Sequence, residues 1–261
     1  MFTSSSFFVH GNSMRKPFSI LLVIFVCTVG SLAQKADQKS SAKPVADTKA
    51  ADGQAQELAK AVYVAHGGDK FKAAKTIVIK GSVDVTSPAI PQAIPGGFTM
   101  AFAGEKYRVE IATPVQSLKQ SYDGEQTYTN SPIGSLPPMN RLGIPLLQRL
   151  GDQGFVVSSL PSDSKKKLGF RITAPDGFFT DFFVDEKTKQ VKSYESMYEF
   201  SGRTYTTSVD IGKYREVEGV FIPEKYSQRF DLGQITVYGD FKAKDILINT
   251  ELAANVFSSV K

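Results

Sequence analysis

Histidine and cysteine are the residues on which enzyme chemistry in this chain would most depend. The sequence holds two histidines and one cysteine. Both His10 and Cys27 lie in an N-terminal segment that reads as a removable signal, so His66 is the one histidine that remains. A Ser-His-Asp hydrolase would have to use it, yet the chain has no Gly-x-Ser-x-Gly turn. Zinc sites need several His or Cys ligands. We therefore expect no metal, no cofactor and no catalytic activity.

The sequence His66-Gly67-Gly68-Asp69 looks locally like a phosphate-binding turn. It follows a predicted helix instead of a strand, however, and it lacks the Lys-Ser/Thr ending of a P-loop. The two glycines suit a helix C-terminus, where the backbone adopts positive φ. We interpret this turn as the end of the first helix of the domain.

The N-terminal segment has the pattern of an export signal. Arg15 and Lys16 precede an apolar run of about a dozen residues, and small residues around Ala33 form a cleavage site. The run is shorter than the roughly 20 residues of a membrane-spanning helix. We expect residues 1–33 to be a signal peptide, cleaved near Ala33, and the mature protein to be exported.

The remaining chain divides into a tail and one domain. Residues 34–53 are rich in Lys, Ala, Asp, Ser and Gln, which predicts a disordered linker, and residues 54–261 are expected to form a single domain. The formal net charge is +5, of which Arg15 and Lys16 belong to the signal. The rest is spread along the chain without a basic block, so we expect no nucleic-acid partner.

Hydrophobic periodicity predicts a mainly β (α+β) fold. A helix over residues 54–65 is followed by segments with period-two alternation, the first of which places Ile77, Ile79 and Val83 on one face. The connections are short, as in antiparallel hairpins. About 10–11 strands are expected, and a sheet of that size tends to curl. The prediction is a strongly curved antiparallel sheet or incomplete barrel, closed by the N-terminal helix and a short apolar lid.

Two apolar, proline-broken segments interrupt the strand pattern. One covers residues 87–97, and the other covers residues 131–151 with a short helix near Ile144 to Leu150. Aliphatic side chains on irregular backbone have to be buried, and the concave side of the sheet offers the room. The expected lid residues are Ile90, Ile94, Leu136, Leu142, Ile144, Leu146, Leu147 and Leu150.

Aromatic strands give the second group of candidates. In the segment 178–185 phenylalanines point to both faces, so both faces are expected to be covered. This pattern fits a lined hydrophobic cavity, but it fits better a filled core between a helix and a loop. The candidate cavity-lining and lipid-binding residues are Phe98, Met100, Phe102, Tyr107, Val109, Ile111, Phe170, Ile172, Phe178 and Phe182.

The order of these features resembles a known family. The signal is followed by the helix ending at Gly67-Gly68, the Tyr122–Tyr128 hairpin, the apolar helix at 144–150 and the closing segments Val217–Pro223 and Ile246–Leu252. In this order the chain resembles the LolA-like superfamily, which includes outer-membrane lipoprotein-sorting proteins. The resemblance covers nearly all of the mature chain.

The resemblance implies a fold and a function. Such proteins are incomplete barrels closed by helices around an apolar cavity that holds lipid. By this likeness the chain would be a periplasmic, non-enzymatic binder or carrier of lipid acyl chains or lipoproteins, with lipid or an acylated protein as its partner. Carriers of this kind use an arginine near the cavity mouth to control their cargo. Arg108 and Arg141 are the mouth candidates here, since each lies beside a segment expected at the cavity rim.

Two other functions stay open. An envelope sensor or assembly module of the same fold would bind a protein partner, such as an envelope membrane protein, through a sheet edge or the cover loops. A hydrolase would need His66. In either case we expect a monomer.

Overall fold

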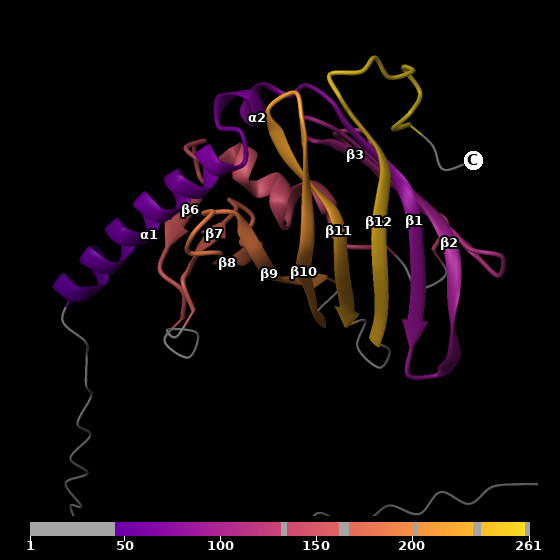
Figure 1. Ribbon diagram of the computed structural model, residues 1–261, viewed down its shortest axis with the longest axis horizontal. Coiled ribbons are helices and arrows are strands. Elements are labelled where there is room, and N and C mark those ends of the chain that lie inside the picture. The colour runs from indigo at the N-terminus through magenta and orange to yellow at the C-terminus, as the bar shows by residue number, and fades with distance from the viewer. Residues whose placement is uncertain (1–44, 132–134, 162–166, 201–202, 232–235, 259–261) are drawn as a thin grey trace, which may run out of the picture. The chain divides into compact units, whose positions relative to one another are not determined.

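One curved antiparallel sheet of twelve strands dominates the part of the chain that the structure describes. The computed structural model describes residues 45–131, 135–161, 167–200, 203–231 and 236–258. The sheet bends around an inner side on which the helices lie (Figure 1). Its strands are β1 (Ile77–Ser87), β2 (Ile90–Ala103), β3 (Lys106–Ala112), β4 (Ser117–Tyr122), β5 (Thr127–Thr129), β6 (Val156–Ser158), β7 (Gly169–Thr173), β8 (Phe179–Val184), β9 (Val191–Phe200), β10 (Arg203–Val217), β11 (Val220–Asp231) and β12 (Thr236–Ile248).

The strand order explains why a segment has to cross the inner side. It runs β5-β4-β3-β2-β1-β12-β11-β10-β9-β8-β7-β6. Strands β1 to β5 extend the sheet toward one edge, and β6 to β12 return from the other edge until β12 pairs with β1. The chain between β5 and β6 must therefore pass from one edge of the sheet to the other. It does so with two 3-10 helices, η1 (Met139–Arg141) and η2 (Ile144–Arg149).

The predicted fold class is confirmed. The protein is mainly β, and its sheet is strongly curved without closing into a barrel. The described residues form twelve strands, where about 10–11 were expected. Ile77, Ile79 and Val83 are buried on the inner face, as their alternation predicted.

Residues 90–97 correct the prediction of a first irregular cover. They form the first half of β2, so Ile90 and Ile94 lie in a strand and not on a lid. Strand β1 pairs with β2 along this half, whereas β3 pairs only with residues 97–103. One side of β2 is therefore unpaired before Gly97. Prolines, which lack an N–H group, are tolerated in a strand with a free side, and this explains how Pro91 and Pro95 fit here.

Helix α1 (Val45–Ala65) begins nine residues before its predicted start at Gln54. The described part of the expected linker, residues 45–53, is therefore helical, which corrects that prediction. Ala, Lys and Gln are strong helix formers as well as common linker residues. Asp52 attaches this part of the helix to Ser159. Its Oδ1 accepts hydrogen bonds from the Ser159 main-chain nitrogen (2.9 Å) and hydroxyl (3.2 Å). Residues 34–44 and the expected signal lie outside the described residues.

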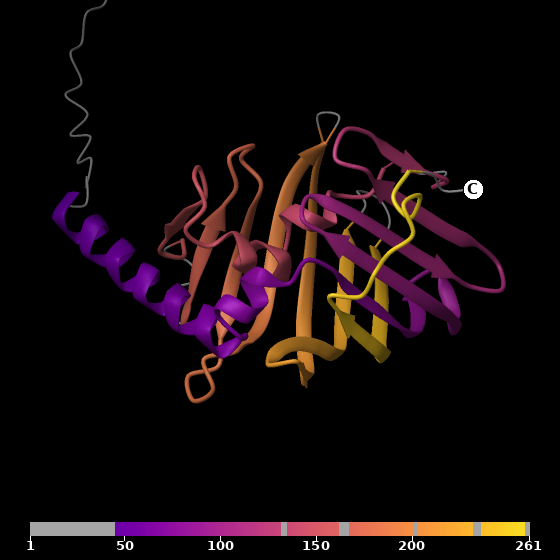
Figure 2. The ribbon, with the colours of Figure 1, turned by 90° about the horizontal axis from the view of Figure 1, so that it is seen from above.

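The helix packs on strands β6 and β7 through small side chains. Ala55, Ala59 and Val62 are buried on one face of α1, and the helix contacts both strands. Figure 2 shows α1, in indigo, lying along this end of the sheet. No helix in the described residues is long and apolar enough to span a membrane.

The turn after α1 is the helix end that the sequence predicted. The Gly68 main-chain nitrogen donates to Tyr63 O (2.9 Å), and Gly67 and Gly68 have φ values of 115° and 55°. A Cβ atom on Gly67 would lie 2.6 Å from Gly219 O, so the turn packs closely against the β10–β11 hairpin. A short helix, α2 (Asp69–Ala73), follows and buries Phe71.

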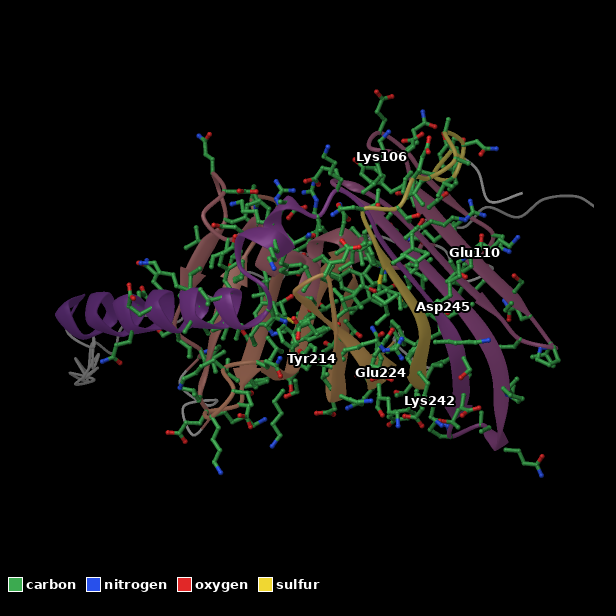
Figure 3. The ribbon with its side chains drawn as sticks, turned by 45° about the horizontal axis from the view of Figure 1, so that its top comes forward. Lys106, Glu110, Tyr214, Glu224, Lys242 and Asp245 are labelled. Carbon is green, nitrogen blue, oxygen red and sulfur yellow. The ribbon has the colours of Figure 1, made fainter. Side chains whose placement is uncertain are left out.

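The outer face of the sheet carries the charged residues. Glu224 forms ion pairs with Lys213 (2.8 Å) and Arg215 (2.7 Å), and Lys242 and Asp245 project from neighbouring β12 (Figure 3). Hydrogen bonds from Lys213 and Arg215 lower the pKa of Glu224 to about 2. Charge is thereby kept on the side of the sheet away from the helices.

Candidate functional site

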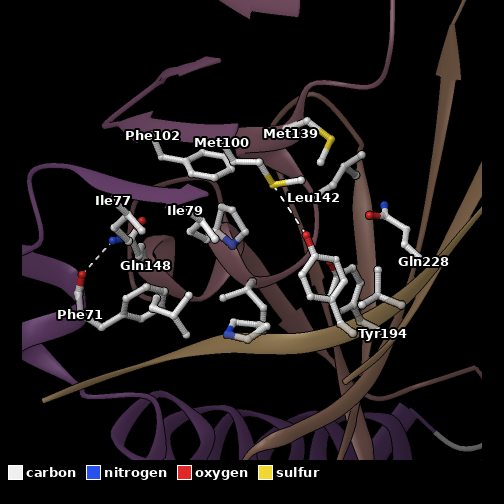
Figure 4. A pocket seen from close by; sticks show the side chains of 16 residues that line it. Phe71, Ile77, Ile79, Met100, Phe102, Met139, Leu142, Gln148, Tyr194 and Gln228 are labelled. Carbon is white, nitrogen blue, oxygen red and sulfur yellow. Dashed lines mark hydrogen bonds between the residues drawn. The ribbon is translucent and has the colours of Figure 1, made fainter. Parts of the chain in front are cut away.

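Two apolar cavities lie on the inner face of the sheet. The first, named the lid cavity here, has a volume of about 90 Å³. Figure 4 shows it between the sheet and the segment that carries η1 and η2. It is lined by Phe71, Ile77, Ile79, Met100, Phe102, Met139, Leu142, Ile144, Pro145, Gln148, Tyr194, Val209, Ile222, Pro223, Tyr226 and Gln228.

The second cavity, named the end cavity here, lies where β1, β2, β11 and β12 meet the β3–β4 turn. Its volume is about 320 Å³. Val115 and Tyr238, which both line it, are 74% and 42% exposed, so the cavity reaches the protein surface. Its lining residues are Val85, Ile94, Ile111, Thr113, Val115, Gln116, Leu118, Ser131, Leu136, Phe230, Val237, Tyr238, Gly239 and Phe241.

Among the residues that the structure describes, no charged side chain lines either cavity. The polar groups of the lid cavity are occupied within the protein. Gln148 Nε2 donates to Phe71 O (2.8 Å), and Gln228 Nε2 donates to Thr207 Oγ1 (3.0 Å). Burial raises the pKa of the Tyr194 and Tyr226 hydroxyls above the ordinary value of 10.0. Both cavities therefore offer a ligand mainly apolar contact.

The segment between η1 and η2 is fixed to the sheet by its main chain. The Gly143 nitrogen donates a hydrogen bond to Thr180 Oγ1 of β8 (3.0 Å). Gly143 has φ +65°, and a Cβ atom there would lie 2.5 Å from the Tyr194 ring. Only glycine fits this backbone conformation at such a close approach. Leu146 and Leu147, both fully buried, anchor the next turn in the core.

Ion pairs hold the same segment at the rim. Arg141 pairs with Asp176 of the β7–β8 turn and, at 3.7 Å, with Glu105 of the β2–β3 turn. Arg149 pairs with Glu105 and with Asp152. These side chains are between 31% and 41% exposed, so each pair contributes at most about 1 kcal/mol.

The structure brings some of the predicted lining and lid residues together. Met100, Phe102, Leu142 and Ile144 line the lid cavity. Ile94, Ile111 and Leu136 line the end cavity. The predicted lid helix is present as η2, in which Leu146 and Leu147 face the core, and Leu150 at its end is partly buried. Ile90 is the first residue of β2.

The other predicted lining residues belong to a filled core. Phe98, Tyr107, Val109, Phe170, Ile172 and Phe182 are each at most 3% exposed and line neither cavity. Phe178 is partly buried and meets Tyr198 edge-on, with ring centroids 6.1 Å apart. Large aromatic side chains here fill the space below α1 instead of leaving it open.

Strand β8 shows why phenylalanines on both faces do not imply a cavity. On the inner face Phe182 stacks on Phe170 at 5.2 Å between ring centroids. On the outer face the Arg171 guanidinium lies 3.7 Å from the centroid of Phe179, and the Lys167 ammonium lies 4.4 Å from that of Phe183. Cation–π contacts and aliphatic stems therefore cover the outer rings without a second layer of structure.

The structure places one mouth candidate on the outer face of the sheet and the other beside the lid cavity. Arg108 alternates with the buried Tyr107 and Val109, which places it on the outer face, where it pairs with Glu110 and donates to Val256 O (2.8 Å). The expectation that it lies at a cavity rim is therefore corrected. Arg141 lies next to Leu142 of the lid cavity, with its guanidinium in the ion pairs described above.

Several lining residues were missed at the sequence level. Tyr194, Val209, Ile222, Tyr226 and Gln228 come from β9, β10 and β11. Those strands were predicted, but no residue of theirs was chosen as a lining residue. Inward alternation in the segments 191–200, 204–214 and 222–230 would have identified them.

His66 is a structural residue in this fold. It is fully buried, its Nε2 accepts a hydrogen bond from the Val191 nitrogen (3.1 Å), and Nδ1 faces Phe221 O at 3.4 Å. The Tyr214 ring meets it edge-on, 5.0 Å away. Burial lowers the pKa of His66 to about 4. Among the described residues, no cluster of His, Cys, Asp and Glu could hold a metal ion.

Comparison with solved structures finds similar chains at low sequence identity. The chain is similar in structure to LolA superfamily proteins. One is the LolA superfamily protein NE2245 from Nitrosomonas europaea, with a TM-score of 0.48 and 13% identity, covering 78% of this chain and 96% of that one. Another is a putative outer membrane lipoprotein-sorting protein domain from Vibrio parahaemolyticus, with a TM-score of 0.46 and 9% identity, covering 79% and 97%.

A third similar structure is a DUF1329 family protein from Desulfovibrio piger, with a TM-score of 0.47 and 8% identity, covering 79% of this chain and 97% of that one. No protein-family model matches the chain, and no curated sequence is detectably similar to it. At these identities the likeness concerns the fold alone, so function is inferred below from this chain's own cavities.

Proposed function

We propose that this protein binds a lipid acyl chain, free or attached to a protein, on the inner face of its sheet without transforming it. The observation that carries this proposal is the end cavity, with its volume of about 320 Å³, its apolar lining and its access to the protein surface. Pockets for small ligands typically measure about 300–1,000 Å³. In this proposal the protein acts after export to the periplasm, as a carrier or receptor of acylated molecules.

The size of the end cavity suits a hydrocarbon chain. A methylene group is about as large as a water molecule, whose share of liquid volume is about 30 Å³. The cavity would therefore admit on the order of ten methylene groups. Their burial contributes about 0.8 kcal/mol each, or about 8 kcal/mol before the loss of translational freedom is subtracted. The expected affinity is therefore micromolar at best.

Two features favour binding over catalysis or partner recognition. The nitrogens of His66 face main-chain groups, and no carboxylate of the described ranges lines either cavity, so these residues offer no general base near a bound chain. A protein partner could add a strand at an edge of the sheet, but the edge strands β5 and β6 have only three residues each. Such short edges would give few main-chain hydrogen bonds. The unpaired side of β2 before Gly97 contains Pro91 and Pro95, which have no N–H group to donate.

A binding titration with a fluorescent fatty acid tests the proposal. The protein should bind the probe, and Ile111→Asp, which places a carboxylate in the end cavity, should weaken binding at least tenfold. Leu247→Asp is the matched control because Leu247 is 45% exposed outside both cavities, and it should leave affinity unchanged. If neither the parent protein nor the control binds the probe, the acyl-binding proposal fails and recognition of a protein partner becomes the better account.

A further inference from the structure

Two stacked rings lie where the linings of the two cavities adjoin. Tyr226 of β11 lines the lid cavity, and Phe241 of β12 lines the end cavity. They are directly paired in the register of the two strands, and their rings stack with centroids 4.7 Å apart and planes at 6°. The register also pairs Gln228 of the lid cavity with Gly239 of the end cavity. The boundary between the cavities therefore lies along this part of β11 and β12, and the aromatic pair supplies its largest side chains.

Two residues of strand β2 contact the stacked pair of Tyr226 and Phe241. The Phe98 ring meets Phe241 edge-on at 5.1 Å between centroids, and the Tyr226 hydroxyl lies 3.8 Å from Met100 Sδ. Figure 4 draws that last contact as a dashed line across the lid cavity. Phe241 is 2% and Phe98 3% exposed, so both rings are held in the interior.

Glycines leave the room that these rings occupy. A Cβ atom on Gly239 would lie 2.6 Å from the Phe241 ring, and one on Gly81 would lie 2.8 Å from the Phe98 ring. Each ring therefore lies over the backbone of a glycine on the inner face. Because Phe241 lines the end cavity and its stacking partner Tyr226 lines the lid cavity, the Phe241 ring stands between the two spaces.

We propose that Phe241, stacked on Tyr226, sets the length of the acyl chain that the protein accommodates. This inference rests on the acyl-binding function proposed above. A chain that enters the end cavity from the protein surface leaves its polar end in water and reaches the Phe241 ring after on the order of ten methylene groups. Beyond the ring lies the lid cavity, which is equally free of charged side chains and would receive a longer chain if the ring were smaller.

Chain-length dependence of affinity tests this inference. Saturated fatty acids of about 8 to 16 carbons would compete with the fluorescent fatty acid, each below its micelle-forming concentration. For the parent protein, affinity should rise about fourfold per methylene group and then level off near ten carbons. In Phe241→Ala the rise should continue for several more carbons, because the end cavity would then join the lid cavity.

Two further variants make the result interpretable. Phe241→Leu keeps an apolar side chain of similar bulk, so it should fold, and it should move the levelling point by a smaller amount in the same direction. Phe257→Ala is the matched control, because it also removes a phenylalanine ring, but from the small cluster with Val78 and Ala101 on the outer face. It should keep the levelling point of the parent protein.

The outcomes separate the two proposals. Probe binding with no levelling point, or with one that neither Phe241 variant moves, would overturn the role of Phe241 and leave acyl binding intact. Failure of the parent protein to bind any probe would overturn acyl binding, and the length limit with it. If Phe241→Ala does not fold, the result with Phe241→Leu decides.

Discussion

The Gly143 main-chain nitrogen donates its hydrogen bond to Thr180 Oγ1, while the Gly143 Cα sits against the ring of Tyr194. One residue thus joins the segment that crosses the inner side to both β8 and β9. Thr180 Oγ1 is also hydrogen-bonded to Ser196 Oγ (2.7 Å), so the contact is part of a buried polar group. The lid cavity keeps its shape because of this attachment.

Gly143→Ala should loosen that attachment. The new methyl group would meet the Tyr194 ring at 2.5 Å on a backbone with φ +65°, so we expect the free energy of unfolding to fall by about 1–3 kcal/mol. Urea denaturation measures it. Gly177→Ala is the control, because Gly177 also has positive φ (+86°) but no atom within 4 Å of the added methyl group. Equal losses in the two variants would show that the contact with Tyr194 contributes nothing.

Glu105→Gln should increase opening of the crossing segment with little loss of global stability. Glu105 pairs with both Arg141 and Arg149 and is 41% exposed, so the loss should stay below about 1 kcal/mol. Hydrogen exchange of η2 should quicken a few-fold at low salt, and the difference should shrink as salt screens the pairs. Glu57→Gln, which breaks an exposed pair with Lys60 on α1, should leave η2 unchanged. Unaltered exchange in Glu105→Gln would contradict the role of these pairs.

His66 should make stability depend on pH between 7 and 5. Its pKa is about 4 in the folded protein and about 6.5 when unfolded. The unfolded chain therefore binds the proton more tightly, and the contribution of His66 is fully present above pH 6.5 and is lost as pH falls toward 4. From pH 7 to 5 we expect a loss of about 2 kcal/mol in the free energy of unfolding. His66→Gln should reduce this dependence of the free energy of unfolding on pH. An equal dependence in both proteins would show that His66 is not responsible.

Arg108→Ala should lower stability without affecting acyl binding. Arg108 is on the outer face, paired with Glu110 and bonded to Val256 O, so its removal should reduce the free energy of unfolding by about 1 kcal/mol. Affinity for the fluorescent fatty acid should stay within twofold of the parent value. A tenfold change in affinity would mean that Arg108 does reach the cargo.

The fold followed from the sequence because period-two alternation marks each strand separately. The buried positions Ile77, Ile79 and Val83 could be read without knowing their partners. The strand at 90–97 could not, because Pro91 and Pro95 are acceptable only where β3 no longer pairs with β2, and that depends on the lengths of neighbouring strands. The helical start of α1 depended in the same way on a distant contact, between Asp52 and Ser159.

The cavities were harder to predict than the fold. Alternation identifies the residues that point inward, but it does not show whether the space that they face is filled. That depends on the volume of side chains from several elements. Phe182 and Met100 are both inward residues on strands, yet Phe182 stacks on Phe170 below α1, whereas Met100 faces open space below η1. Gly81 and Gly239 let the rings of Phe98 and Phe241 lie close to the backbone of the sheet. Hydrophobic periodicity gives no signal for such contacts.

Native mass spectrometry with lipid extraction, on protein isolated without detergent, tests the central claim most directly. We predict a bound species whose mass corresponds to a lipid or acylated peptide, reduced in Ile111→Asp and retained in Leu247→Asp. A ligand-free mass that stays unchanged when a medium-chain fatty acid is added would contradict acyl binding in the end cavity.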